Sequence, residues 1–379
     1  MRVTAVTAWF PSQKAAASGA FIVKDCHAIA QAGVDIQLIH LVNPQLDDGR
    51  REFEYEGIKV RRLPFNAYSP LDVRRVSRLL PSLIGDSEVI HTMAMSSLAP
   101  VAFAKLRHIP WVHTEHWEGV SNPQGLGFKN RLFHPLVLHL EKQPDVVVSV
   151  AGSFLSNPIR RAGRKKPTVE IPCIVPPAPH LAERRKPVLP YRLVSVGAMI
   201  PRKDPMFALR VVSELNRRGQ TSSLTWIGAG PLRTAMEDYA REHKIELHLT
   251  GSLPPSEVFA KLSEADVFIG PTHAENFFVS CAEAILQGRP VVVSAFGGHR
   301  YYIRDYVGEV MARHDVGAYA DAVEKVLGNY PHPSASEIAA SVGDAFSPEV
   351  VGKSYRLVYE SLSSQNLAAL EDLPPWRGW

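Results

Sequence analysis

The chain has 379 residues, which is long for one hydrophobic core and suits two domains of ordinary size. Hydrophobic residues make up 45% and charged residues 21% of the chain, a composition that excludes an intrinsically disordered protein. The apolar runs are of strand length and far shorter than the roughly 20 residues of a membrane span. The apolar start, Met1–Val6, lacks a small-residue cleavage site, so we expect a first strand there rather than a signal peptide.

Charge and cysteine content indicate which partners and which cellular compartment to expect. The net charge is +4, with a net of +5 in residues 1–183 (21 Lys and Arg against 16 Asp and Glu) and −1 in residues 184–379 (21 against 22). We therefore expect any anionic surface or acceptor to meet the first half. Cys26, Cys173 and Cys281 are odd in number and lack metal-type spacing, so we expect reduced thiols in a cytoplasmic protein.

Short apolar segments alternate with amphipathic ones through both halves, a pattern typical of α/β domains with mostly parallel sheets. In the first half, we expect helices over Ala20–Ala32 and Ala99–Arg107. The expected strands of that half are Val3–Trp9, Asp35–His40, Val60–Leu63, Glu88–His91, Trp111–Thr114 and Asp145–Val150. Those of the second half are Tyr191–Val196, Ser223–Ile227, Glu246–Thr250, Asp266–Ile269 and Val291–Ser294.

Residues 71–84 place apolar side chains at helical spacing with arginines between them. A basic amphipathic helix of this kind can lie on an anionic membrane, or it can be a surface helix packed on its own sheet. Pro81 interrupts the pattern, which favours the second interpretation.

A proline-rich segment over residues 171–179, followed by the basic run Arg184–Pro187, separates the two halves. Proline fixes φ and lacks an N–H, so this segment cannot be a helix or an inner strand. We place the domain boundary here, with a first domain over residues 1–183 and a second over residues 184–347.

In the second half, strand after strand ends at glycine. In open parallel sheets, ligands bind outside the carboxyl ends of the strands, where glycine permits close approach of a ligand to the backbone. This recurrence favours a nucleotide-type site over ordinary turns. The glycines concerned are Gly197, Gly228 with Gly230, Gly251, Gly270, and Gly297 with Gly298.

The most informative segment runs from Asp266 to Pro290, as a strand, a polar loop and a helix that ends near Gly288. The helix start near Asn276–Val279 offers N–H groups to phosphate or sugar oxygens. Glu283 stands in an otherwise apolar run, so we expect a hydroxyl or cationic partner, and a ribose diol would serve. A Glu on a solvent-facing stripe is the alternative.

Two adjacent cations, Arg202 and Lys203, follow the Gly197 strand end. A diphosphate leaving group needs such cations to neutralise its developing charge. The alternative is a solvated pair at a helix start.

Taken together, these features resemble the retaining glycosyltransferases of the family-four type (glycosyl transferases group 1), which carry a Glu-(seven residues)-Glu motif. Residues 190–330 follow the order of that family: the Gly197 loop with Lys203, the Gly228–Pro231 loop, Glu275 with Glu283, and Gly297-Gly298. The resemblance implies a GT-B fold, with two Rossmann-like α/β domains facing across a cleft. It also implies that a C-terminal helix, over about residues 348–379, packs back on the first domain.

The resemblance also implies roles for individual residues. Glu283 would hold the ribose hydroxyls, Lys203 would contact the diphosphate, and Glu275 with the backbone of Asn276, Phe277 and Phe278 would contact the donor sugar. Together with Gly197, Arg202, Gly228 and Gly230, these residues form the expected donor site, and His116, Glu275 and Lys203 are the expected catalytic residues.

In the first half, the segment from Phe10 to Phe21 is similar to the family's glycine loop, so Gly19 would face the donor phosphate, and His116 matches the family's active-site histidine. This segment is not the Gly-x-Gly-x-x-Gly of a dinucleotide-binding dehydrogenase. Two positions depart from the family pattern: Ala198 replaces an arginine, for which Arg202 is the candidate substitute, and Tyr301 replaces a glutamate.

We therefore expect a retaining glycosyltransferase that uses a nucleoside-diphosphate sugar, with UDP as the favoured nucleotide, in cell-surface glycan or secondary-metabolite biosynthesis. No Asp-x-Asp metal motif is convincing, so we expect no metal or other cofactor, and no nucleic-acid partner. Contact with the inner face of a membrane through the basic first domain is a further expectation. The acceptor and the oligomeric state stay open. The alternatives are a UDP-sugar epimerase of the same fold and a catalytically degenerate sugar-nucleotide-binding subunit, the latter suggested by Ala198 and Tyr301.

Overall fold

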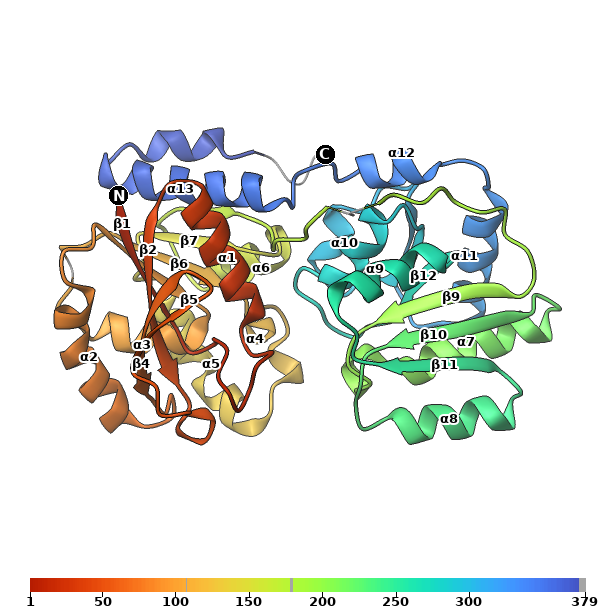
Figure 1. Cartoon of the computed structure of the whole chain (residues 1–379), viewed down its shortest axis with the longest axis horizontal. Helices are drawn as coiled ribbons and strands as arrows, with labels where there is room; N and C mark the ends of the chain where they lie inside the picture. The colour runs from red at the N-terminus through yellow and green to blue at the C-terminus, as the bar shows by residue number, and fades with distance from the viewer. Residues whose placement is uncertain (107, 178–179, 375–379) are drawn as a thin grey trace. The chain divides into compact units, whose positions relative to one another are not determined.

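In the computed structural model, which describes residues 1–106, 108–177 and 180–374, the chain divides into two α/β units (Figure 1). Unit 1 comprises Met1–Ile174 and the segment that begins at Ala345, and unit 2 comprises Val175–Asp344. The chain thus leaves unit 1 after Ile174, inside the proline-rich segment and earlier than the expected boundary at residue 183. It re-enters unit 1 just before the expected C-terminal helix.

Unit 1 is a doubly wound sheet in which β3 and β4 pair antiparallel and all other neighbours pair parallel. In sheet order the strands are β3 (Glu52–Tyr55), β4 (Ile58–Pro64), β2 (Asp35–Val42), β1 (Arg2–Thr7), β5 (Val89–Met93), β6 (Trp111–Glu115), β7 (Val146–Ser149) and β8 (Thr168–Glu170). Its helices are α1 (Ala20–Gln31), α2 (Pro70–Ile84), α3 (Leu98–Ala102), α4 (Glu118–Ser121), α5 (Phe128–Leu140), α6 (Ser153–Arg161) and α13 (Pro348–Ser363).

The alternation of side chains along each strand distributes the core of unit 1 over two faces. On β1, Val3 and Ala5 pack with α1 and α13, whereas Val6 packs with α2, α3 and α5 on the opposite face. Strands buried on both faces are often apolar runs, as β7 is, whereas β5 and β6 are buried but also carry His and Thr side chains.

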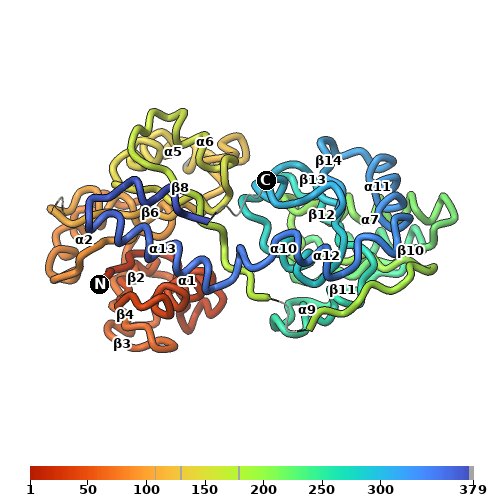
Figure 2. Tube along the Cα trace, turned by 90° about the horizontal axis from the view of Figure 1, so that it is seen from above, coloured from red at the N-terminus to blue at the C-terminus, as the bar shows by residue number. Residues whose placement is uncertain are grey.

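The C-terminal helix α13 lies beside α1, as Figures 1 and 2 both show. Ser347 caps it by accepting a hydrogen bond from the Val350 N–H, and Gly352 allows the helix backbones to meet, because a Cβ there would overlap the Ala28 carbonyl oxygen. The hydroxyl of Tyr359 lies 2.7 Å from Nδ1 of His91 on β5. The expected packing of the C-terminal helix on the first domain is therefore observed for α13, while residues 375–379 of the expected segment lie outside the described residues.

Unit 2 contains one sheet in which all neighbouring strands are parallel. In sheet order the strands are β11 (Glu246–Gly251), β10 (Ser222–Ile227), β9 (Tyr191–Val196), β12 (Val267–Gly270), β13 (Val291–Ser294) and β14 (Gly308–Met311). The helices are α7 (Pro205–Arg217), α8 (Arg233–Glu242), α9 (Pro255–Glu264), α10 (Val279–Leu286), α11 (Val316–Gly328) and α12 (Ala335–Ala340). Helices α7, α8 and α11 share one core with the sheet, and α9 and α10 contact its strands as well.

Two expectations about helices in unit 1 were wrong. Helix α2 continues through Pro81 to Ile84 instead of being interrupted, because the missing N–H costs one hydrogen bond while Val76, Leu80 and Ile84 stay buried against β1 and β2. The helix expected over Ala99–Arg107 ends at Ala102 as α3, and Arg107 lies outside the described residues.

Candidate functional site

The loops after β9 and β10 touch through their glycines at the carboxyl edge of the unit 2 sheet. The indole Nε1 of Trp226 donates to the Gly197 carbonyl oxygen at 2.8 Å, and the Met199 N–H donates to the Ala229 carbonyl oxygen at 3.0 Å. A Cβ on Gly228 would overlap the Gly197 carbonyl oxygen, and a Cβ on Gly230 would lie 2.5 Å from that of Met199. Glycine is needed here because the two loops share the same space.

Glu275 is the centre of a charged cluster in this edge. Its Oε1 forms an ion pair with Nζ of Lys203 and lies 3.0 Å from the Arg202 guanidinium and 3.4 Å from the Thr272 hydroxyl. The Arg202 guanidinium also donates to the Ala274 carbonyl oxygen at 2.6 Å. The structure therefore brings together three of the expected site residues, Arg202, Lys203 and Glu275, from loops that follow two adjacent strands, β9 and β12.

The side chain of Lys203 links this cluster to the two other expected features. It passes over Gly197, where a Cβ would lie 3.2 Å from its Cε, and its Nζ lies 4.7 Å from the centroid of the Phe278 ring. An ammonium group on a ring face is held by the ring quadrupole, which favours this position for a cation that would meet a diphosphate.

The start of α10 is held in a constrained conformation. Phe278, the residue before the helix, has φ +64°, which is unusual for a bulky residue. The Tyr302 hydroxyl lies 3.0 Å from the Phe277 carbonyl oxygen and 2.9 Å from that of Phe278, and the Asn276 carbonyl oxygen accepts the Gly298 N–H at 2.7 Å. First-turn N–H groups of a helix lack partners within the helix, so this fixed end can bind an anion.

Glu283 lies on α10 and is half-buried, whereas its neighbours Ala282 and Ala284 are buried. The Ser280 hydroxyl donates to the Val196 carbonyl oxygen at 3.1 Å and so fixes α10 against the end of β9. Glu283 and the Gly197 loop are thus carried by elements that are directly joined.

In unit 1, the expected site residues Gly19 and His116 are related through Phe21. Gly19 precedes α1 with φ +66°, and a Cβ there would overlap the Trp9 backbone. Two residues later, the Phe21 ring lies 4.6 Å from the ring of His116, centroid to centroid. Burial lowers the pKa of His116 to about 4, so its imidazole is neutral near pH 7.

The residues that depart from the expected family pattern have other contacts. Ala198 is exposed, and the Tyr301 hydroxyl accepts a hydrogen bond from Arg300 at 2.7 Å. Arg202, the expected substitute for the missing arginine, is directed toward Ala274 and Glu275 in this structure.

Several residues that shape the site were not identified from the sequence. Thr272 contacts Glu275, Tyr302 fixes the start of α10, and His299 lies against Phe278 with ring centroids 5.0 Å apart. Burial lowers the pKa of His299 to about 4. Only the proximity of Tyr302 and His299 to Gly297-Gly298 hinted at them, because their contacts depend on how loops far apart in sequence fold onto one another.

Comparison with protein families gives a consistent result for both units. The family model described as Glycosyl transferases group 1 matches residues 180–341, and that described as Glycosyl transferase 4-like domain matches residues 18–174.

Individual relatives and structures extend the comparison. A glycogen synthase of Mycobacterium tuberculosis is 28% identical over 60% of this chain, and the match spans 56% of that relative's length. A 2-deoxystreptamine glucosyltransferase of Streptomyces kanamyceticus is 25% identical over 84% of this chain and 91% of its own. Anabaena HepE, solved in complex with UDP-glucose, shares the fold with a TM-score of 0.64 at 14% identity, covering 98% of this chain and all of HepE.

The structure also bears on membrane insertion. Within the described parts of the chain, no helix has both the length and the apolar character that a membrane span requires.

Proposed function

Because this chain belongs to the glycosyltransferases of the family-four type and has their GT-B fold, we propose that it transfers a sugar from a nucleoside-diphosphate sugar to an acceptor hydroxyl with retention of configuration. The cluster of Lys203, Arg202 and Glu275 beside the start of α10 carries this proposal. It combines two cations for a diphosphate with a carboxylate that can accept hydrogen bonds from sugar hydroxyls.

The roles that we propose follow from these positions. Lys203 neutralises charge on the departing diphosphate, the start of α10 binds oxygens of the donor, and Glu283 accepts hydrogen bonds from the ribose. For unit 1, the proposed functional residues are Gly19 and the neutral His116, as the family resemblance implies. UDP is the proposed nucleotide, supported by the UDP-glucose complex of HepE, which has the same fold. We propose that the reaction needs no metal ion, since these cations and the helix start supply the positive charge.

Calorimetric titration with UDP and with uridine separates these roles. Glu283→Ala should weaken both ligands, because both carry the ribose. Lys203→Ala should weaken UDP about tenfold or more while leaving uridine unchanged, since a hydrogen bond to a charged group contributes about 1.5–3 kcal/mol.

Lys261→Ala is the matched control, because Lys261 pairs with Glu264 on the exposed surface of α9. Unchanged UDP affinity in both Glu283→Ala and Lys203→Ala would contradict the proposed donor site. Binding of UDP-sugars without transfer to any acceptor would favour a degenerate binding subunit, and turnover of a UDP-sugar alone would favour an epimerase.

A further inference from the structure

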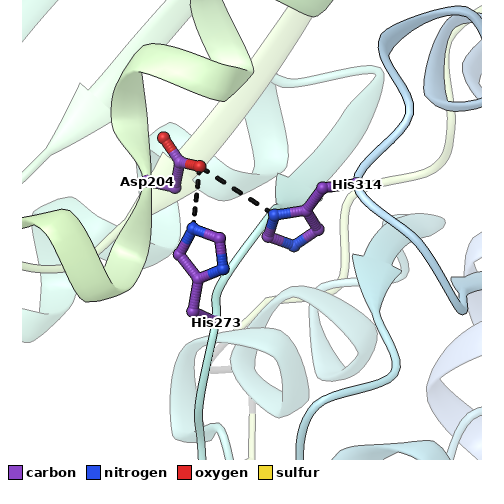
Figure 3. Close-up of side chains that lie close together, drawn as sticks. All are labelled: Asp204, His273 and His314. Carbon is purple, nitrogen blue, oxygen red and sulfur yellow. Dashed lines mark hydrogen bonds and ion pairs between the residues drawn. The ribbon is translucent and has the colours of Figure 1, made fainter. Parts of the chain in front are cut away.

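Two histidine side chains of unit 2 converge on one carboxylate oxygen, and none of the three residues belongs to the expected donor site. Oδ2 of Asp204 lies 3.0 Å from Nε2 of His273 and 3.9 Å from Nδ1 of His314, and Figure 3 shows both rings directed at this oxygen. The three ligand-type atoms all lie within 4.8 Å of one another.

These residues come from three separate loops at the carboxyl edge of the sheet. Asp204 follows β9 and begins α7, His273 follows β12, and His314 follows β14. Their meeting is therefore a product of the fold, in the part of a parallel sheet where ligands bind.

Neighbouring groups orient each of the three side chains. Asp204 has φ +44°, and its Oδ1 accepts the Phe207 N–H at 3.1 Å as the cap of α7, which turns Oδ2 toward the histidines. The backbone N–H of His273 donates to the Arg202 carbonyl oxygen at 2.8 Å, which fixes the backbone from which the ring extends. The ring of His314 packs between those of Phe207 and Phe296, with centroids 4.9 and 5.7 Å away.

The geometry points to a binding site for one divalent transition-metal ion of the Zn²⁺ type, with Asp204 Oδ2, His273 Nε2 and His314 Nδ1 as its ligands. Zinc–ligand bonds of about 2.0–2.2 Å in a tetrahedron place ligand atoms about 3.3 Å apart. The distances of 3.0 and 3.9 Å lie on either side of this value, so small movements of the two rings suffice. Two imidazoles and one carboxylate are a donor set that suits Zn²⁺ and its neighbours in the first transition row.

Charge and access also suit a metal ion. The side chain of His314 is only 14% exposed, so its position beside Asp204 is fixed by packing. The side chain of His273 is 53% exposed, so an ion can enter and keep water as a further ligand. The Arg210 guanidinium lies 3.9 Å from Oδ1 of Asp204, which is the oxygen that caps α7 and not the one that faces the histidines.

A second cluster of metal-type residues, His113, Glu115 and Glu141 in unit 1, provides a contrast. All three side chains are fully buried, and the His113 Nε2 lies 3.2 Å from Glu115 and 3.1 Å from Glu141. The two carboxylates raise the pKa of His113 to about 9 despite its burial, so it is a protonated member of an ion-pair network. Of these two clusters, both found within the described residues, the accessible one in unit 2 is better suited to a metal ion.

The proposed ion would not take part in the chemistry but would fix the loops that carry the donor site. Asp204 directly follows Lys203, and His273 precedes Glu275 by two positions. A shared metal would tie these two loops together and restrict the Lys203–Glu275 pair between them.

Calorimetric titration of the chelator-treated, full-length chain with ZnCl₂, without nucleotide, tests the site. We expect one ion per chain. We expect affinity to fall at least about tenfold in His273→Ala and in His314→Ala, since loss of even an outer partner of a metal ligand costs 10- to 100-fold. Co²⁺ added to the wild-type chain should give the strong visible absorption of a tetrahedral site.

His248→Ala is the control, because His248 pairs with Glu246 at 3.0 Å on the surface of the same unit and, among the described residues, is in no cluster of three metal-type ligands; it should bind Zn²⁺ like the wild type. Absence of stoichiometric binding, or wild-type affinity in His273→Ala, would overturn the proposal. If His314→Ala does not fold by circular dichroism, His273→Ala decides, since its exposed side chain can be removed without opening a cavity. The metal titration is performed without nucleotide, so its result does not depend on whether the proposed donor site is right. A failure of the metal proposal would likewise not contradict the UDP titrations.

Discussion

Glu275 forms ion pairs with two cationic side chains in this structure. Its Oε1 contacts both Lys203 and Arg202, so the cluster retains a net charge of +1 from two cations and one carboxylate. A diphosphate brings about two negative charges and competes with Glu275 for the same cations. Donor binding would therefore release Glu275 from Lys203 and free its oxygens for sugar hydroxyls. Glu275 would thus pair with the cations before the donor binds and accept hydrogen bonds from the donor sugar afterwards.

A buried acid in unit 1 gives a pH-dependent prediction at the scale of a residue. Asp25 on α1 is buried, and burial raises the pKa of its carboxyl to about 8 from an unfolded value near 3.8. A pKa that folding raises means that stability is fully present below about pH 4 and is lost as pH rises toward 8. Asp25→Asn removes this loss, so the variant should gain stability over the wild type by up to about 1.4 kcal/mol per pH unit between pH 4 and 8.

Urea unfolding at several pH values measures this difference. Asp238→Asn is the control, because Asp238 is exposed on α8 and pairs with Arg241, and we expect little change and no trend with pH. A deficit of Asp25→Asn that is equal at every pH would mean that Asp25 is ionised and hydrogen-bonded when folded.

At the scale of elements, the contact between α1 and α13 depends on the absence of one side chain. A Cβ at Gly352 would overlap the Ala28 carbonyl oxygen, which is backbone and cannot turn away. Gly352→Ala should therefore lower the free energy of unfolding by about 1–3 kcal/mol, as overpacking typically does, despite the better helix propensity of alanine. Thermal or urea unfolding of the full chain measures the effect.

Gly328→Ala provides the matched control, because Gly328 ends α11 and a Cβ there would meet no atom within 4 Å. It should be neutral or slightly stabilising. Equal stability of the two variants would show that α13 can shift away from α1 at little cost.

Most of the strands that the sequence predicted carry several buried residues, but the half-exposed edge strand β11 was predicted as well. Strands β9 and β13 were predicted with their observed limits, because both are β-branched or apolar segments that end near glycine or polar residues, and such a pattern is visible without a fold. Strands β3, β8 and β14 were missed, since they have only 4, 3 and 4 residues, are largely half-exposed and carry weak apolar patterns. The prediction that Pro81 interrupts α2 was wrong, because the rule that proline breaks helices does not consider the burial of Val76 and Leu80.

The residues of the candidate site also fall into those that the sequence could predict and those that it could not. Its members near in sequence, such as Glu275 and Glu283, could be assigned from one strand-loop-helix segment. The approach of Lys203 to Glu275, of Tyr302 to α10 and of His314 to Asp204 depends on which strands are neighbours in the sheet. Sequence spacing has no information on that order, so the ion pairs and the proposed metal site required the structure.

For the molecule as a whole, the uneven distribution of charge bears on which surfaces the protein can bind. The excess of positive charge lies in residues 1–183, where the exposed face of α2 carries Arg74, Arg75 and Arg78. Val76, Leu80 and Ile84 of α2 are buried against its own sheet, so these side chains are not available for a membrane. Helix α5 is different, because Phe128, Leu132 and Leu136 follow one another at intervals of one helical turn and are 85%, 68% and 46% exposed.

Apolar side chains on an exposed helix of a basic domain favour peripheral contact with an anionic lipid surface, which stays a prediction. We expect the chain to co-sediment with vesicles that contain phosphatidylglycerol, more weakly at high salt, and hardly with phosphatidylcholine alone. Leu132→Glu should reduce this binding, because it places a negative charge in the apolar row. Val188→Glu should not, because Val188 is comparably exposed but lies in unit 2. Equal loss in both variants would mean that added negative charge, and not the face of α5, controls the contact.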